Sequence, residues 1–190
     1  MMNSAISLAD WHRLPQLDSG MYGYMPSDPS QPENPILTMA VPRIVTLSPG
    51  QVIFRWCHSG APVPAASPWW STKRGAQAIL RAALGGDSSD AARSANNVAK
   101  MWKSDLRAVV FAKVLAEPVR CFLGVGRAIW DARHRERLDS KQHQLYIPNM
   151  TLPGTRTLSP EALSHFSFRP AIPSAQVTAQ DWEAATGREF

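Results

Sequence analysis

The distribution of proline along the chain is the feature that most restricts its fold. Ten of the 16 prolines lie in residues 1–68, five lie in residues 148–173, and none lies between Trp69 and Glu117. Proline fixes φ and removes a backbone donor, so it interrupts helices and central strands. We therefore expect regular structure mainly in the middle of the chain.

Two proline-rich segments flank a single predicted core. Residues 1–40, which include the linker-like SDPSQPENP at 27–35, are predicted to form an irregular N-terminal arm. Residues 41–150 form the expected core, and residues 151–190 form a C-terminal extension that packs on it, with a short helix in 179–187. A chain of 190 residues is long enough for one domain with a real core and too short for two ordinary domains.

Apolar, β-branched runs predict strands on both sides of a helical middle. The runs are RIVTL (43–47), QVIFRW (51–56), AVVFAKVL (108–115), VRCFL (119–123) and the late LYIP run. The first two should pair as a hairpin across Ser48-Pro49-Gly50, because proline presets φ and glycine tolerates a positive φ. Strands that flank helices in this order favour an α+β fold over regular βαβ repetition.

Helical spacing is strongest just after the SPWWST run. Ser71 or Thr72 can cap a helix whose apolar residues recur every three or four positions, and Gly85-Gly86 should end it. A second helix is predicted at about 89–104, and 125–138 reads as either an amphipathic helix or a long basic loop.

Charge is concentrated in the middle of the chain. Lys and Arg number 14 against 7 Asp and Glu in residues 51–140, a net charge of +7, whereas the counts are 2 against 4 in residues 1–50 and 4 against 4 in residues 141–190. Such a segment attracts an anionic partner, such as a nucleotide, a nucleic acid or an acidic protein surface. Charge alone does not choose among them or exclude a merely soluble basic surface.

Other bulk properties exclude several classes of protein. No apolar run approaches the roughly 20 residues of a membrane helix, and the N-terminus lacks the pattern of a standard secretory signal peptide. We expect a protein without a membrane span, either cytoplasmic or delivered into a target cell. Cys57 and Cys121 lie in apolar runs that favour buried thiols, and the 5 histidines lack zinc-site spacing, so no metal site is expected.

Three short stretches contain the candidate site residues. Arg55 lies in an otherwise apolar strand, where a buried guanidinium needs hydrogen-bond acceptors or an anion. It therefore either forms a structural pair or binds a ligand. In SPWWST (67–72), one tryptophan is expected in the core, and the other could form a flat wall beside a nicotinamide, adenine or nucleobase ring. In KQHQLYIPN (141–149), Gln142 and Gln144 stand at the mouth of a buried strand.

Taken in chain order, these stretches resemble the ADP-ribosyltransferase superfamily, in the branch with an arginine, a Ser-Thr-Ser-like strand end and a late Glu/Gln-x-Glu motif. The resemblance covers about residues 43–150. It implies an α+β fold, a split β-sandwich with flanking helices, that grips NAD. The motifs that carry it are Arg55 in an early strand, Ser71-Thr72 after two tryptophans, and Gln142-His143-Gln144 before LYIP.

The resemblance also implies a role for each motif. Arg55 would bind the phosphates of NAD, since a guanidinium pairs bidentately with phosphate. Ser71 and Thr72 would support the nicotinamide side of the pocket, and Trp69 or Trp70 would shape its wall. In the family, the last acid of the late motif bonds the nicotinamide ribose and stabilises the cationic centre that forms as nicotinamide leaves.

Gln144 stands where the family has that catalytic glutamate. Glutamine can still hold a ribose hydroxyl, but it lacks the negative charge that stabilises a developing cation. Three explanations are open: a Glu-to-Gln inactivation, a naturally weak or noncatalytic member, or a different register. We favour inactivation, because Gln144 heads the apolar strand and the nearest upstream acids, Glu136 and Asp139, lie in the preceding basic segment.

With glutamate at position 144 the motif would be Gln-x-Glu, and Gln142 would be the residue facing the acceptor. Glutamine there resembles superfamily members that modify asparagine or nucleic-acid bases more than arginine-specific ones. The charge of +7 in the middle segment makes a nucleic-acid acceptor worth testing.

The predicted function is therefore transfer of ADP-ribose from NAD to a macromolecule, protein or nucleic acid, by a bacterial toxin or effector that Gln144 renders weak or inactive. An NAD glycohydrolase, with water as acceptor, is the nearest enzymatic variant. For a toxin, an immunity protein is a further candidate partner, which the sequence does not identify. The alternative, from another class, is a noncatalytic basic interaction protein whose tryptophans and arginines bind nucleic acid or a protein partner.

Overall fold

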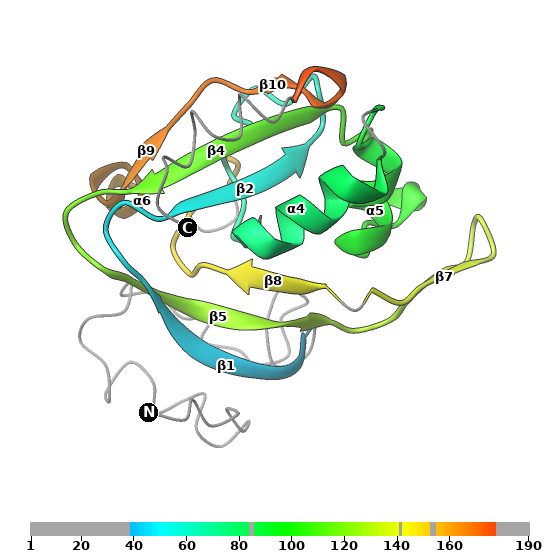
Figure 1. The fold of residues 1–190 in the computed structure, drawn as a ribbon, viewed down its shortest axis with the longest axis horizontal. Helices are drawn as coiled ribbons and strands as arrows, with labels where there is room; N and C mark the ends of the chain where they lie inside the picture. The colour runs from blue at the N-terminus through cyan, green and yellow to red at the C-terminus, as the bar shows by residue number, and fades with distance from the viewer. Residues whose placement is uncertain (1–38, 84–85, 141, 153–154, 178–190) are drawn as a thin grey trace.

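The computed structural model describes residues 39–83, 86–140, 142–152 and 155–177, which fold into strands and short helices (Figure 1). The strands are β1 (Met39–Leu47), β2 (Val52–Cys57), β3 (Trp69–Ser71), β4 (Ala108–Val114), β5 (Val119–Gly126), β6 (Ile129–Asp131), β7 (Glu136–Leu138), β8 (His143–Tyr146), β9 (Phe166–Phe168) and β10 (Ile172–Pro173). The helices are α4 (Lys73–Ala82), α5 (Ser89–Ala95) and α6 (Pro160–His165), with 3-10 turns η1 (Lys100–Trp102) and η2 (Ser174–Gln176).

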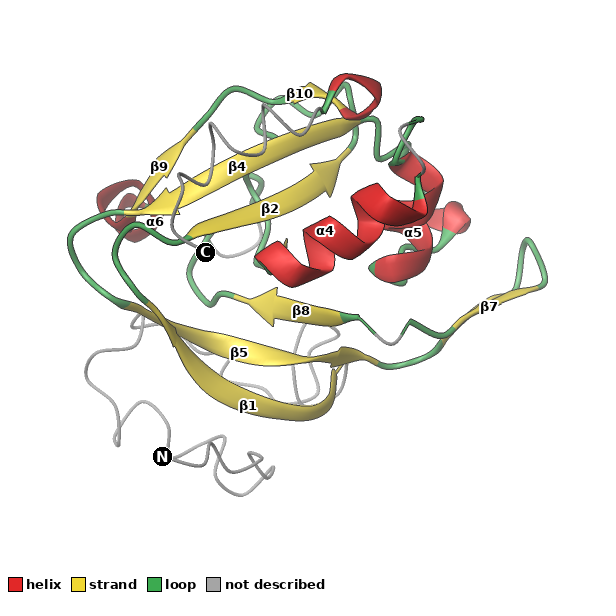
Figure 2. Ribbon diagram, in the orientation of Figure 1, coloured by secondary structure: helices red, strands yellow, loops and turns green. Residues whose placement is uncertain are grey.

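An eight-stranded sheet is the frame of the described residues. Its order is β1-β5-β8-β3-β2-β4-β10, with β9 also paired to β4, and all of its pairings are antiparallel. Figure 2 shows β1, β5 and β8 as one half and β2, β4, β9 and β10 as the other. The short strand β3 pairs with both halves and joins them. The predicted α+β class is confirmed.

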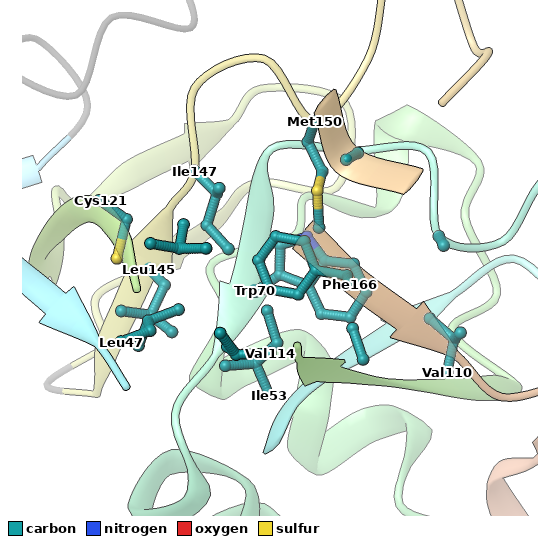
Figure 3. Close-up of a cluster of buried hydrophobic side chains, with 14 residues drawn as sticks. Leu47, Ile53, Trp70, Val110, Val114, Cys121, Leu145, Ile147, Met150 and Phe166 are labelled. Carbon is teal, nitrogen blue, oxygen red and sulfur yellow. The ribbon is translucent and has the colours of Figure 1, made fainter. Parts of the chain in front are cut away.

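One hydrophobic cluster draws on both halves of the sheet (Figure 3). Leu145 of β8 and Cys121 of β5 come from one half, and Ile53 of β2 and Phe166 of β9 come from the other. Trp70 of β3 is 2% exposed and belongs to the same cluster. The apolar side chains that the two halves share therefore hold the sheet together on this side.

A second cluster lies under the helices. Ala76 and Ile79 of α4 and Ala92 of α5 pack with Phe54 and other side chains of β2 and β4. Because successive side chains of a strand point to opposite faces, Phe54 joins this cluster while Ile53 joins the first one. Burial on both faces explains why β2 reads as a continuous apolar run.

The helix predicted after SPWWST is confirmed as α4. Thr72 is its N-cap, and Thr72 Oγ1 accepts a hydrogen bond from Gly75 N at 3.0 Å. The buried residues Gly75, Ala76 and Ile79 lie at the spacing of one helical face. The helix ends earlier than Gly85-Gly86, with Ala83 as the C-cap.

The predicted hairpin of residues 43–47 and 51–56 is wrong. A turn does form, with Gln51 N bonded to Ser48 O at 3.1 Å and Gly50 at φ +86°. After it, Gly50 N donates to Val114 O and Val114 N donates to Gln51 O, so the chain joins β4. Since β2 is apolar on both faces, it is buried between β3 and β4, and β1 pairs with β5 in the other half.

Residues 125–138 form neither a helix nor a long loop. Strand β5 continues to Gly126, and β6 and β7 then pair as a two-stranded sheet. The carboxylate of Asp131 accepts backbone hydrogen bonds from Arg133 and His134, both at 3.1 Å, and Arg135 has φ +50°. This aspartate turn stabilises the hairpin in place of a helix.

The second predicted helix, about 89–104, is shorter than expected. Helix α5 ends at Ala95, and η1 follows at Lys100–Trp102. Asn97 and Lys103 adopt left-handed φ values of +51° and +56°, which an α-helix does not contain. The two left-handed residues therefore turn this segment into the irregular wall described below.

Two predicted segments lie outside the described residues: the helix at 179–187, and the arm at 1–40 except for Met39 and Ala40, which begin β1. The described part of 151–190 supplies α6, β9 and β10, and both strands pair with β4. Cys57 and Cys121 are buried and unpaired. Among the described residues, no helix is long and apolar enough to cross a membrane.

The shared cluster predicts a large cost for truncating Leu145, which is 1% exposed. Leu145→Ala should lower the free energy of unfolding by about 2–5 kcal/mol, because it removes buried methyl groups and leaves a cavity. Leu163→Ala is the matched control, since Leu163 is 58% exposed on α6, and should change stability by less than about 0.5 kcal/mol. Chemical denaturation measures both, and similar losses in the two variants would contradict this packing.

Candidate functional site

The strands β2, β3 and β8 lie side by side and bring the three predicted motifs together. Ser71 at the end of β3 is the register partner of Gln144 in β8 and of Phe54 in β2. Arg55 follows Phe54 in β2. Residues separated by 16 and 73 positions in the sequence (71 − 55 and 144 − 71) thus meet on three adjacent strands.

A cavity of about 440 Å³ opens at this meeting point. Its volume lies within the roughly 300–1,000 Å³ of small-molecule sites. The predicted site residues that line it are Arg55, Trp69, Trp70, Ser71 and Gln144. The lining also includes Asn96, Asn97, Trp102 and Arg127, which the sequence did not single out.

Arg55 links β2 to the chain around β3. Its Nε donates to Pro64 O at 3.2 Å, and its Nη1 donates to Trp69 O at 3.0 Å. Burial lowers the pKa of Arg55 to about 10, so the side chain remains protonated at neutral pH. Among the described residues no carboxylate forms an ion pair with it. A desolvated cation balanced only by carbonyl oxygens favours an anionic ligand.

Gln144 presents a buried side-chain amide to the cavity. The residue is 6% exposed, and within the described part of the chain its amide has no hydrogen-bond partner. A Cβ atom on Gly126 would lie 3.0 Å from Gln144 Nε2, so glycine leaves room for the amide. Since an unsatisfied buried polar group costs about 1–3 kcal/mol, this amide is suited to bonding a ligand.

The two hydroxyls of the Ser71-Thr72 pair have different roles. Ser71 lines the cavity, is 3% exposed, and donates from Oγ to Asn96 Oδ1 at 3.1 Å. Thr72 caps α4 and is not a lining residue. The structure thus separates a pocket hydroxyl from a helix cap, and the predicted cofactor-binding role of Thr72 finds no support in the cavity.

The two tryptophans of β3 also differ. Trp70 is part of the shared hydrophobic cluster, and its indole Nε1 donates to Ser67 O at 2.8 Å. Trp69 is half-buried and makes an edge-to-face contact with Tyr146, with ring centroids 5.0 Å apart. Trp70 is therefore the core tryptophan, and Trp69 is the one available as a flat wall.

Gln142 lies outside the cavity lining. It precedes β8, and its backbone N donates to Ser140 Oγ at 2.9 Å. The upstream acids Glu136 and Asp139 are not lining residues either. Gln144 is consequently the residue of the late motif that reaches the cavity.

Asn97 is the main site residue that sequence reasoning missed. It is 2% exposed, and its Nδ2 donates to Gly126 O at 3.2 Å and to Arg127 O at 3.0 Å. Its Oδ1 accepts from Ser140 N at 2.8 Å. One side chain thereby joins the end of α5, the end of β5 and the approach to β8. The Asn-Asn pair inside the helix predicted at about 89–104 was the available signal that this helix ends early, since asparagine tolerates the left-handed conformation at helix ends.

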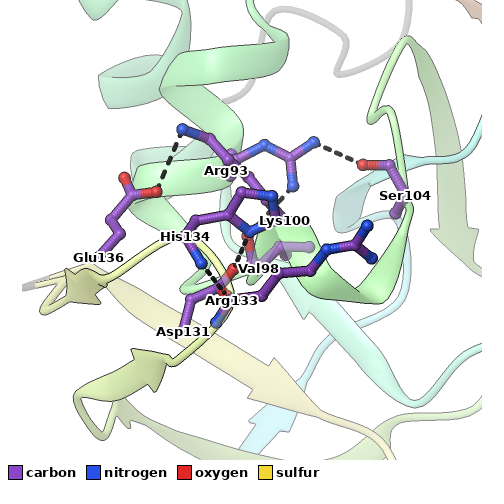
Figure 4. A network of polar contacts seen from close by, with 8 residues as sticks. All are labelled: Arg93, Val98, Lys100, Ser104, Asp131, Arg133, His134 and Glu136. Atoms are coloured by element: carbon purple, nitrogen blue, oxygen red, sulfur yellow. Dashed lines mark hydrogen bonds and ion pairs between the residues drawn. The ribbon is translucent and has the colours of Figure 1, made fainter.

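A polar network holds the neighbouring wall in place (Figure 4). The guanidinium of Arg93 in α5 donates to the carbonyl oxygens of Val98 and Ser104, both in residues that line the cavity. Lys100 of η1 pairs with Glu136 of β7 at 3.1 Å. Within the described residues, no three His, Cys, Asp or Glu side chains gather where they could hold a metal ion.

Comparison with known proteins identifies no family. No family model matches the chain, and no curated protein matches it. A solved structure described as "Rhs1-CT in complex with cognate immunity protein RhsI1" is similar, with a TM-score of 0.46 and 13% identity over 72% of this chain and 83% of that one. A likeness this distant carries no information on function.

The bonds of Asn97 predict that Asn97→Ala destabilises the protein by about 2–4 kcal/mol, because three backbone groups lose their partner and alanine strains the left-handed φ. Asn96→Ala is the matched control, with φ −102° and one side-chain bond, and should cost about 1 kcal/mol. Urea denaturation compares them. Equal losses of stability in the two variants would show that Asn97 does not join these segments. The variant Asn97→Gly removes the hydrogen bonds without the strain of a left-handed alanine, and so measures the bonds alone.

Proposed function

We propose that the cavity binds NAD and that the chain is a mono-ADP-ribosyltransferase domain of the toxin or effector type, with Gln144 in the place of the catalytic glutamate. One observation carries the proposal: Ser71 and Gln144 are register partners on β3 and β8, and Arg55 stands on the next strand, β2. All three line one cavity. This is the convergence that the resemblance requires.

The charges of the cavity support a dinucleotide as ligand. Its described lining includes the two arginines Arg55 and Arg127 and no carboxylate. The two carbonyl bonds of Arg55 use two of the five N–H groups of a guanidinium, so donors remain for phosphate oxygens. The pyrophosphate of NAD would supply the anion that this arginine lacks in the protein itself.

The uncharged groups of the cavity support the nicotinamide-ribose end of the same ligand. The Gln144 amide offers both a donor and an acceptor to a ribose hydroxyl. The Ser71 hydroxyl is held by Asn96, and the half-buried ring of Trp69 provides a surface for nicotinamide. Cationic groups for the pyrophosphate and an aromatic surface for the nicotinamide ring thus lie in one cavity.

In the proposed reaction, the glycosidic C–N bond of NAD breaks and nicotinamide leaves with the electron pair. The acceptor forms a new bond to the same ribose carbon and loses a proton. Positive charge develops on the ribose as the bond breaks, and a carboxylate at position 144 would stabilise it. Gln144 retains the hydrogen bonds without the charge, so this chain should bind NAD and turn it over slowly.

Binding is tested by thermal unfolding with and without NAD. At 100 times its Kd, NAD should stabilise the protein by about 2.7 kcal/mol. Arg55→Lys should weaken NAD binding roughly 10- to 100-fold, because lysine lacks the planar guanidinium fork that can bond the two carbonyls and still pair bidentately with phosphate. Arg156→Lys, in an exposed loop, is the control. Nucleic-acid binding without any stabilisation by NAD would favour the noncatalytic interaction protein.

Catalysis is tested by comparing the chain with its Gln144→Glu variant. Nicotinamide release and transfer of label from NAD to cell extract should rise on the order of 100- to 1,000-fold, since the variant restores the stabilising charge. Gln142→Glu adds the same charge outside the cavity and should not raise nicotinamide release. If Gln144→Glu produced neither nicotinamide nor label while still binding NAD, the transferase proposal would fail.

A further inference from the structure

A basic hairpin projects beside the cavity. Residues 127–139 carry β6 and β7, and Figure 1 shows this arm extending beyond β8 and α5. Its first residues, Arg127 and Ile129, line the cavity, and its last residues lead toward β8 and Gln144. The hairpin is thus attached at the rim of the cavity.

The outer face of the hairpin is aromatic and cationic. Trp130 and Arg137 are register partners, and both point away from the buried side chains of Asp131 and Leu138. Trp130 is 60% exposed. An indole exposed to this extent is unusual, because tryptophan is highly buried on average. Trp102 of η1, in the cavity wall, is also 54% exposed.

Each acidic side chain of the hairpin has a basic partner, whereas some of its basic side chains form no ion pair within the described residues. Asp131 is buried and contacts His134 at 3.0 Å, Glu136 pairs with Lys100 at 3.1 Å, and Asp139 pairs with Arg137 at 3.6 Å. Arg133 and Arg135 at the tip are exposed, and within the described residues neither guanidinium forms an ion pair. The tip therefore offers two cations to an anionic partner.

We propose that the hairpin of residues 127–139 binds single-stranded nucleic acid, with bases stacked on Trp130 and Arg137 and the phosphate backbone on Arg133 and Arg135. Stacking on an exposed indole requires unpaired bases, which a duplex does not offer. An acidic protein would match the charge as well, and the comparison with poly-glutamate below distinguishes it from nucleic acid.

Binding is measured without NAD, by fluorescence anisotropy with labelled single strands of about 12 nucleotides, RNA and DNA in separate arms. Both strands should bind, and affinity should fall with salt between about 50 and 200 mM. Trp130→Ala should weaken binding on the order of 5- to 150-fold. R133Q/R135Q should reduce the slope of log affinity against log salt by roughly 1 to 2.

The control double variant K113Q/R156Q removes the same charge from exposed positions on β4 and in the loop before α6, and should change affinity less than about twofold. Matching thermal unfolding midpoints show that each variant is folded. The proposal is overturned if neither strand binds, if the hairpin and control variants lose affinity equally, or if poly-glutamate binds as tightly as the oligonucleotides, which would assign the hairpin to an acidic protein.

A second readout separates this proposal from the function proposed above. If the hairpin variants lose nucleic-acid binding while NAD still raises the unfolding midpoint, both stand. If the chain binds nucleic acid through the hairpin and NAD does not stabilise it, the NAD proposal fails and the hairpin site stands alone. Binding of NAD with no hairpin-dependent nucleic-acid binding would reject the hairpin site and keep the NAD proposal.

Discussion

The pairing of the short strand β3 with both β2 and β8 is the interaction on which the described structure depends. Through Ser71, β3 contacts β2 at Phe54 and β8 at Gln144. The same three residues of β3 supply Trp70 to the shared core and Trp69 and Ser71 to the cavity. The join between the halves of the sheet and the candidate site are therefore built from one segment.

Because β3 is so short, its backbone pairing is limited, and hydrogen bonds from side chains add to the connection between the two halves of the sheet. Arg55 donates to Pro64 O and Trp69 O and ties β2 to the chain before and within β3. Asn97 ties the helical side of the cavity to β5 and to the approach to β8. Each of these residues is a stabilising clamp at the cavity wall. The polar groups that shape the cavity are consequently also groups that hold the fold.

Several features of the fold followed from local rules and were predicted. The strands at β2, β4 and β5 came from apolar, β-branched runs, and α4 came from helical spacing after a threonine cap. The predicted hairpin of 43–47 with 51–56 was wrong because turn residues indicate where the chain reverses. They do not indicate which strand the following segment pairs with. The prediction of a helix or a long loop at 125–138 was wrong because the aspartate turn at Asp131 outweighed a weak helical pattern.

The sequence by itself determined which residue types were available for a site: an arginine in an apolar strand, a hydroxyl beside two tryptophans, and two glutamines before a buried strand. Only the tertiary structure decided that Arg55, Ser71 and Gln144 share a cavity while Gln142 and Thr72 do not line it, and that Asn97 joins three segments. The physical reason is range. Propensities, caps and periodicity act within a few residues, whereas a cavity is set by which strands pair, and that depends on burying both faces of β2 at once.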